Sequence, residues 1–225
     1  MIRMAVVLGL ACILSVSMGC SSHVRAPTPT FEQSWSPQEK PAEGFAIDLP
    51  PTWKQISMDS QTLDAFLDAF LKVGQKANPQ MAAMLEAVRA SGEFKNVKFF
   101  AFDFAPEAVI ADYRTNVFVH VNPTQVELPL DFHVQMDIGM LENMPDVVKP
   151  VTHQRVHLIV GEAEKVQYRM PMINPRGKAM TLVTTWYMIV KGKDGYSVVL
   201  NTTADQAAKY APIFKQISQS FRWIQ

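Results

Sequence analysis

Apolar and polar residues alternate over short stretches from residue 44 onward, and this period of two predicts strands. Residues 45–49 form the first such stretch, and the prolines at 50 and 51 end it. Trp53 and Ile56 predict a short second strand or turn that returns to the core. The folded region is therefore expected to begin with two short extended segments.

Apolar residues then recur at helical spacing over residues 60–91. Leucines and phenylalanines share one helix face from Leu63 to Leu71, and a second apolar face runs from Met81 to Val88. The methionines of this second face could line a ligand groove, but we expect them to pack against a sheet. Two consecutive amphipathic helices are predicted.

Two strands and a third helix are expected in the middle of the chain. Both faces of 94–104 are apolar, which is typical of a central strand, and 115–121 alternates cleanly and is expected to pair with it. Residues 130–144 are ambiguous, because their apolar positions fit both a strand and one helix face. Unbranched side chains and Pro129 at a plausible first helical position favour a helix.

Four further strands are predicted in the last third of the chain, over residues 148–160, 162–170, 180–190 and 195–203. Turn residues separate them at Gly161, 174–177 and 191–195, so consecutive strands form an antiparallel meander. Residues 207–217 predict a last amphipathic helix, and the aromatic tail 221–224 is expected to close the core. The fold class is α/β (α+β), with an antiparallel meander sandwiched by helices.

The first twenty residues have the layout of a bacterial secretory signal, with Arg3 before the apolar run 4–18. A transmembrane helix is the alternative, but a span needs about 20 apolar residues, and serines dilute the second half of this run. Gly19 before Cys20 resembles the lipobox of bacterial lipoproteins, in which signal peptidase cuts before a cysteine that carries diacylglycerol. We expect Cys20 to be lipidated.

Two residues depart from the usual lipobox. Ser17 and Met18 stand where Leu and a small residue are preferred, and Ser17 with Gly19 also suits the ordinary signal peptidase, which would release a soluble protein. Ser21 after Cys20 indicates sorting to the outer membrane if the source has two membranes. The protein is expected to be exported and held on the membrane by its lipid.

Composition changes at residue 44. Prolines among polar residues make 20–43 a semi-extended, lipid-anchored linker, between a signal peptide at 1–19 and one folded domain at 44–225. Trp35 could dock on the domain or dip into a membrane surface, and docking is the expectation. Cysteine is confined to Cys12 and Cys20, so the domain has no disulfide, thiolate metal site or cysteine nucleophile.

The domain at 44–225 shows a resemblance of pattern to a known family. The segments GFAIDLPPTW, GEAEKVQYR, TTWYMIVKGKDGYSVVLNTT and YAPIFKQISQSFRW, between Gly44 and Trp223, together resemble the PsbP-like superfamily. It includes photosystem extrinsic proteins, Ran-binding Mog-type proteins and many bacterial lipoproteins of unknown function. The resemblance implies a PsbP-like α/β/α domain at 44–225, with an antiparallel sheet between helices and 60–91 as an insertion. It carries over no photosystem role.

Candidate chemistry is sparse, because the GxSxG, P-loop, GxGxxG and HExxH motifs are all missing from the sequence. His153 and His157 share one face of a predicted strand but are expected at its rim, and His133 with Asp137 would form an exposed pair on a helix. The remaining candidates are His23 in the linker, His120, the carboxylates Glu162, Glu164, Asp103, Glu107 and Asp112, and the formal glycosylation acceptor Asn201.

These features favour a binding protein over an enzyme. Lys plus Arg (21) equals Asp plus Glu (21), which lacks the positive excess of a nucleic-acid-binding protein. We expect a non-catalytic lipoprotein with a binding or assembly role at the cell envelope, a protein or small-ligand partner there, and no cofactor or metal. The alternative is an envelope hydrolase or metal-dependent enzyme that uses histidines and carboxylates of the meander. A purely structural or adhesive surface protein is a third possibility.

Overall fold

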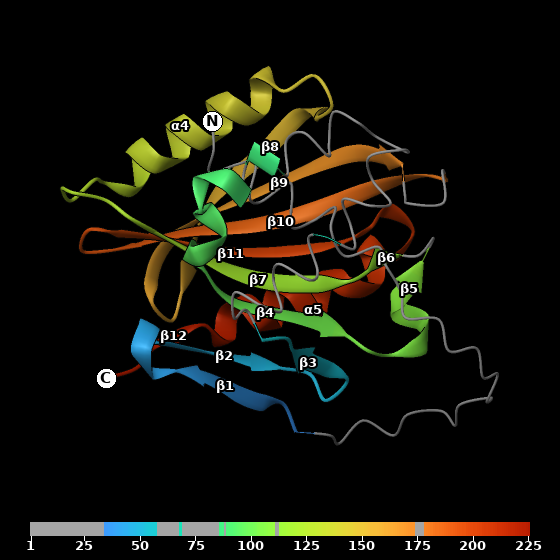
Figure 1. The fold of residues 1–225 in the computed structure, drawn as a ribbon, viewed down its shortest axis with the longest axis horizontal. Coiled ribbons are helices and arrows are strands. Elements are labelled where there is room, and N and C mark those ends of the chain that lie inside the picture. Colours follow the sequence, from blue (N-terminus) through green and yellow to red (C-terminus); the bar gives the residue numbers. More distant parts are fainter. Residues whose placement is uncertain (1–33, 58–67, 69–85, 88, 111–112, 174–177) are drawn as a thin grey trace.

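A seven-stranded antiparallel sheet forms the centre of the molecule (Figure 1). The computed structural model describes residues 34–57, 68, 86–87, 89–110, 113–173 and 178–225. The strand order is β3-β4-β7-β11-β10-β9-β8. The bounds are β3 Trp53–Gln55, β4 Val97–Asp103, β7 Asn116–Pro123, β8 Val148–Leu158, β9 Gly161–Ile173, β10 Ala179–Lys191 and β11 Asp194–Thr203.

The predicted meander is confirmed, since β8, β9, β10 and β11 are neighbours in chain order and every pairing is antiparallel. Strand β7 pairs with both β11 and β4, and Phe118 lies opposite Phe100. The phenylalanine strand β4 has neighbours on both sides but lies second from the edge, beside short β3. Both of its faces are buried, which accounts for its two-sided apolar pattern.

A small second sheet has the order β1-β2-β12, with bounds Ser36–Lys40, Phe45–Leu49 and Arg222–Trp223. Arg222 lies opposite Ala46, so the tail closes the core as predicted. Residues 36–40 were expected in the linker, but they pair with β2 from Ser36 opposite Leu49 to Lys40 opposite Phe45. Residues 36–40 therefore belong to the folded domain, and Trp35 packs against the core.

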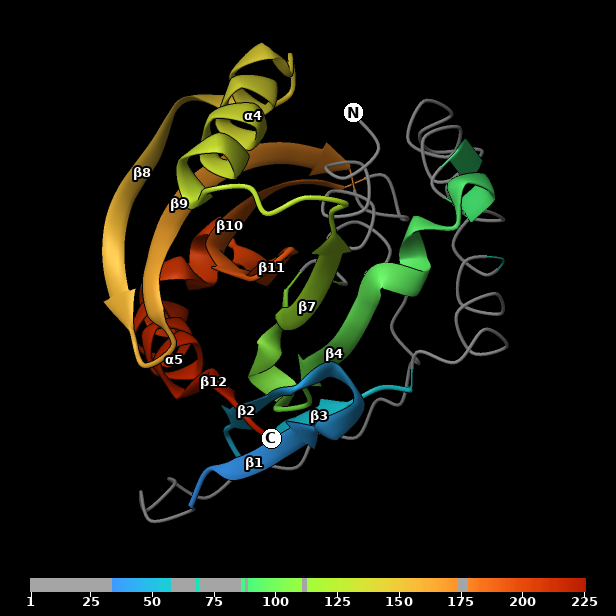
Figure 2. The ribbon, with the colours of Figure 1, turned by 90° about the vertical axis from the view of Figure 1, so that its left-hand side faces the viewer.

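Two helices cover opposite faces of the large sheet (Figure 2). Helix α4, Leu130–Asn143, packs with the face that carries Phe118 and Trp186, and helix α5, Ala207–Ser220, packs with the face that carries Val119 and Tyr187. Because side chains alternate along a strand, neighbouring residues belong to the two different cores. The predicted fold class, an antiparallel sheet between helices, is confirmed.

Shorter elements join these parts. They are the two-stranded pair β5 Val109–Ile110 and β6 Tyr113–Arg114, and the 3-10 turns η1 Pro41–Glu43, η2 Glu93–Asn96, η3 Pro106–Ala108 and η4 Ala204–Gln206. Of the double helix predicted over 60–91, only residues 68, 86–87 and 89–91 are described, and these are helical. Within the described ranges, no helix combines the length and apolar character needed to cross a bilayer.

Candidate functional site: a groove at the edge strand β8

A bulge in the edge strand β8 opens a groove beside β9. Val148 lies opposite Arg169 and Thr152 opposite Gln167, so four steps along β8 correspond to two along β9. Pro150 lies within this irregular stretch and has no backbone N–H to give to the ladder. The groove has a volume of about 360 Å³ and is lined by Val148, Lys149, Pro150, Thr152, Gln167, Tyr168, Arg169 and Val183.

The groove has two cationic residues and no acidic one among its lining residues. Lys149 Nζ donates to the carbonyl oxygens of Leu141 and Met144, the latter at 3.2 Å, so its charge is held at the C-terminus of α4. Arg169 is exposed and has no hydrogen-bond or ion-pair partner among the described residues. The guanidinium of Arg169 is therefore the cation that remains for a ligand.

A charged cluster lies farther along β8, on the side covered by α4. Glu164 is almost fully buried, with its side chain 5% exposed, and its Oε1 lies 2.7 Å from His153 Nδ1. Arg155 Nε donates to Glu164 Oε2 at 3.1 Å, and the same guanidinium contacts Glu162 at 3.4 Å and Asp131 of α4. The hydrogen bond to Asp131 and the nearby carboxylates raise the pKa of Arg155. Arg155 thus joins three carboxylates from two elements.

The two predicted pairs of this region have different outcomes. Glu162 and Glu164 lie in β9, within the strand predicted over 162–170, and Arg155 contacts both of them. His153 and His157 share a face of β8, yet His153 contacts Glu164, whereas His157 lies opposite Glu162. In the part of the chain that the structure describes, no group of three histidine or acidic side chains is placed to hold a metal.

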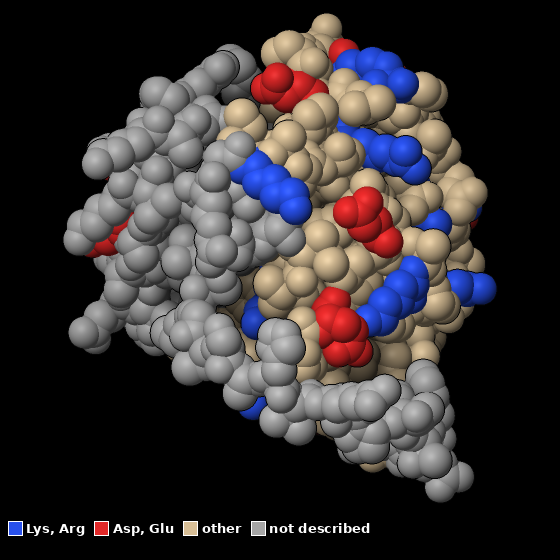
Figure 3. Space-filling model, turned by 90° about the vertical axis from the view of Figure 1, so that its right-hand side faces the viewer, with Lys and Arg blue, Asp and Glu red and all other residues tan. Residues whose placement is uncertain are grey.

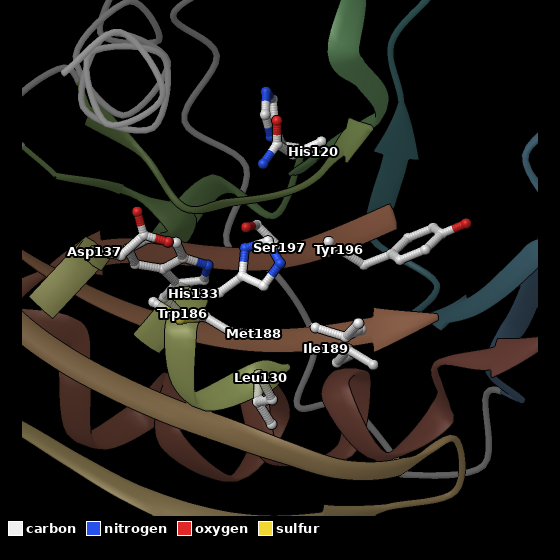
Figure 4. Close-up of a pocket in the computed structure, with 12 residues that line it drawn as sticks. His120, Leu130, His133, Asp137, Trp186, Met188, Ile189, Tyr196 and Ser197 are labelled. Atoms are coloured by element: carbon white, nitrogen blue, oxygen red, sulfur yellow. The ribbon is translucent and has the colours of Figure 1, made fainter. Parts of the chain in front are cut away.

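A small cavity lies between α4 and the sheet (Figure 4). His133 and Asp137 line it from α4, and His120, Trp186 and Gly195 from the sheet. Its volume of about 20 Å³ suits a single water molecule and not a substrate. The exposed position predicted for His133 is wrong, because its side chain is buried against Gly195. Buried His120 lies opposite Ser197 of β11.

A row of buried polar residues crosses the sheet at its other end. Thr184 donates to Asn201 Oδ1 at 2.8 Å, and Asn201 Nδ2 donates to Asn116 Oδ1 at 3.1 Å. Asn116 Nδ2 completes the row with a 2.8 Å bond to the hydroxyl of Tyr113. Asn201 is fully buried, so the formal glycosylation sequence is a structural part of this row.

The carboxylates near the end of β4 are also accounted for by packing. Asp103 is buried and accepts a 2.6 Å hydrogen bond from Tyr210, and Glu107 lies 3.5 Å from Lys209. Burial, followed by the bond to Asp103, raises the pKa of Tyr210. Asp112 lies outside the described residues, as do His23 and Cys20. Among the described residues, the partners of the Asp103 and Glu107 carboxylates do not include a histidine.

On the face of the molecule drawn in Figure 3, the described residues form no extended patch of a single charge sign. Figure 3 shows Lys and Arg interspersed with Asp and Glu over the described part of one face. Such a mixture lacks the continuous basic surface that nucleic-acid binding uses.

The residues that the sequence did not single out are Lys149, Arg155 and Arg169. Each gains its role from the register between β8 and β9 or from the docking of α4, and neither feature has a local sequence pattern. Pro150 inside a predicted strand was the one available signal, because proline within a strand marks an edge or a bulge.

Comparison with solved structures finds proteins of similar fold. LpqN, involved in cell envelope biogenesis of Mycobacterium tuberculosis, is 12% identical, and the match covers 88% of this chain and 90% of LpqN with a TM-score of 0.49. Cyanobacterial PsbP from Synechocystis is 10% identical over 92% of this chain and 98% of that one, also at 0.49. The Saccharomyces cerevisiae Ran-binding protein Mog1p is 10% identical over 86% and 97%, at 0.42.

The chain is similar to these three solved structures at identities of 10–12% and TM-scores of 0.42–0.49. No model of a known protein family matches the chain, and no curated protein matches it significantly. The likeness concerns fold alone, so the roles of these proteins are not transferred to this chain.

Proposed function

We propose that this chain is an exported, lipid-anchored binding protein that holds a small ligand in the groove at the β8 bulge and performs no catalysis there. The observation that carries the proposal is the groove itself. Its volume of about 360 Å³ lies within the range of roughly 300–1,000 Å³ of small-molecule sites.

The groove is suited to binding more than to catalysis. Its lining residues include aliphatic side chains at Val148, Pro150 and Val183 and hydrogen-bonding groups at Thr152 and Gln167. None of the lining residues is a histidine, a carboxylate, a serine or a cysteine, and the ammonium of Lys149 is bonded to the carbonyl oxygens of Leu141 and Met144, so we favour binding over proton transfer in this groove.

The location half of the proposal rests on the N-terminal sequence. Arg3, the apolar run 4–18 and Gly19-Cys20 support export followed by lipidation of Cys20. Intact mass and detergent partitioning of the full-length protein beside Cys20→Ala test it. We expect only the wild type to enter the detergent phase with a diacylglycerol-sized mass increment. A soluble wild-type product without lipid would refute the anchor and leave the groove proposal standing.

The binding half is tested by nuclear magnetic resonance of the exported domain titrated with a library of small metabolites. Binding in the groove shifts the amide signals of Thr152, Gln167 and Val183, because these residues line it. Shifts confined to other elements for every bound compound would show that the groove is not the ligand site.

A second candidate function, hydrolysis, is favoured by the contact between His153 and Glu164. A buried carboxylate that holds one nitrogen of a half-exposed imidazole is the arrangement of base and orienting group in catalytic triads. Hydrolysis of p-nitrophenyl acetate by the wild type and by His153→Ala separates the two functions. Enzymatic turnover that disappears in the variant would support the hydrolase, and equal rates in both proteins would reject it.

A further inference from the structure

The charges at the β8 groove restrict the ligand that it suits. Arg169 and Lys149 line it, and no acidic side chain does. Because Lys149 is bonded to the carbonyl oxygens at the end of α4, its ammonium is already committed. Arg169 is the exposed cation at the groove with no bonded partner among the described residues.

The rest of the groove is largely uncharged. Val148 is 45% exposed, although it is a large apolar residue, and half-buried Val183 of β10 lines the same groove on the other side of β9. Val183 lies opposite Arg169 in the register of β9 and β10, so the cation and this apolar side chain are cross-strand neighbours on one face. An anionic group and an apolar body can therefore be bound at the same time.

From this arrangement we infer that the groove binds a free organic anion, a carboxylate or phosphate monoester with a short apolar body, whose charged group pairs with Arg169. This inference deepens the binding role proposed above and depends on the groove being the ligand site. A planar guanidinium binds both oxygens of a carboxylate or phosphate at once, which fixes the orientation of the ligand. The apolar body then lies against Val148, Pro150 and Val183.

The experiment uses probes that separate the two parts of the ligand. Octanoate carries both charge and apolar body, acetate carries the charge alone, and octanamide carries the same body without charge. Titration calorimetry of the exported domain is expected to show that octanoate binds roughly tenfold or more tightly than either partial probe. Equal affinity for octanamide would overturn the anion assignment, and equal affinity for acetate would overturn the role of the apolar wall.

Single substitutions show which side chain is responsible for the binding of octanoate. Arg169→Gln is expected to weaken octanoate binding by roughly tenfold or more, because a charge-assisted bond is lost. Lys165→Gln is the matched control, because Lys165 lies four residues away on the same face of β9 and outside the groove. The affinity of Lys165→Gln for octanoate is expected to equal that of the wild type. An equal loss in both variants would show a general charge effect and overturn the pairing with Arg169.

A third variant separates failure of this inference from failure of the groove. Val183→Trp fills the groove and is expected to abolish octanoate binding, with circular dichroism to verify the fold. Binding lost in Val183→Trp but unchanged in Arg169→Gln would keep the groove and reject the anion. Binding unchanged in both, with wild-type amide shifts away from Thr152 and Gln167, would reject the groove itself.

Arg169-dependent binding to phosphatidylglycerol vesicles with no response to octanoate would assign a lipid headgroup and overturn the free anion.

Discussion

Tyr210 donates its hydroxyl to Asp103 Oδ2 at 2.6 Å and so joins helix α5 to the end of strand β4. Both residues are buried, at 0% and 4% exposure, and Asp103 Oδ1 also accepts the backbone N–H of Ala105 at 2.9 Å. This carboxylate has a structural explanation that does not involve catalysis. Because of this pair, the stability of the protein is expected to change with pH in the alkaline range.

We predict that the protein loses stability above about pH 10, in part through Tyr210. Burial and Asp103 raise the pKa of Tyr210 above its ordinary value of 10.0. In that range the unfolded chain has released this proton while the folded chain retains it, so the free energy of unfolding falls as pH rises. Burial also raises the pKa of Tyr187 and Tyr196, which add to the same loss.

Urea unfolding of the wild type and Tyr210→Phe at about pH 8 and about pH 11 measures this contribution. Tyr210→Phe should cost about 1–3 kcal/mol at the lower pH, because Asp103 loses a buried donor. The variant should then lose less stability than the wild type between the two conditions. The same loss in both proteins would show that Tyr210 does not titrate in this way.

The cluster around Arg155 predicts unequal costs for its members. Arg155→Ala leaves Glu164 buried with one donor fewer, and should lower the free energy of unfolding by about 1–3 kcal/mol. Asp131→Asn removes the charge of a side chain that is 71% exposed and keeps an oxygen that can accept from Arg155, and should cost about 1 kcal/mol or less. Urea unfolding at neutral pH compares them. A larger loss for Asp131→Asn would show that docking of α4 to β8, and not satisfaction of Glu164, is the main role of Arg155.

Helix α4 is held to the edge strand β8 at both ends, and this predicts a role for Lys149. Its ammonium satisfies carbonyl oxygens at the helix C-terminus, where a cation also interacts favourably with the helix dipole. Lys149→Met should increase hydrogen exchange in the last turn of α4, with Lys165→Gln as the control that leaves it unchanged. Equal protection of Met144 in Lys149→Met and wild type would contradict this role.

Sequence alone predicts the elements with a strong internal period. Strand β9 and helix α5 follow from alternation or helical spacing, because one side of each is buried more completely than the other. Strands β10 and β11 follow from apolar runs bounded by turn residues, because they place side chains in both cores. Strand β1 was missed because it is a polar edge segment, SPQEK, whose pairing with β2 leaves no apolar pattern. The groove was missed for a related reason, since a bulge depends on the register between two strands.

The burial of His133 was also missed from the sequence, because it depends on how α4 packs on the sheet. It gives a further prediction. Gly195 of β11 allows the imidazole to approach, because a Cβ at residue 195 would lie 3.2 Å from His133 Cε1. Gly195→Ala should therefore lower the free energy of unfolding by about 1–3 kcal/mol through overpacking. Gly139 of α4 is the matched control, since a Cβ there meets nothing within 4 Å. Gly139→Ala should raise stability by about 0.5–1 kcal/mol, because alanine favours the helix.

A double variant shows whether the two residues act through one contact. His133→Ala removes the ring that the new methyl group would meet, so adding Gly195→Ala to it should cost much less than Gly195→Ala alone. Urea unfolding of the four proteins in this cycle gives the coupling energy, expected to be about 1 kcal/mol or more. Additive costs would mean that Gly195 is required by the backbone of β11 and not by His133. The sequence offers no pattern that links these residues, because 62 positions separate them and only the docking of α4 on the sheet brings them together.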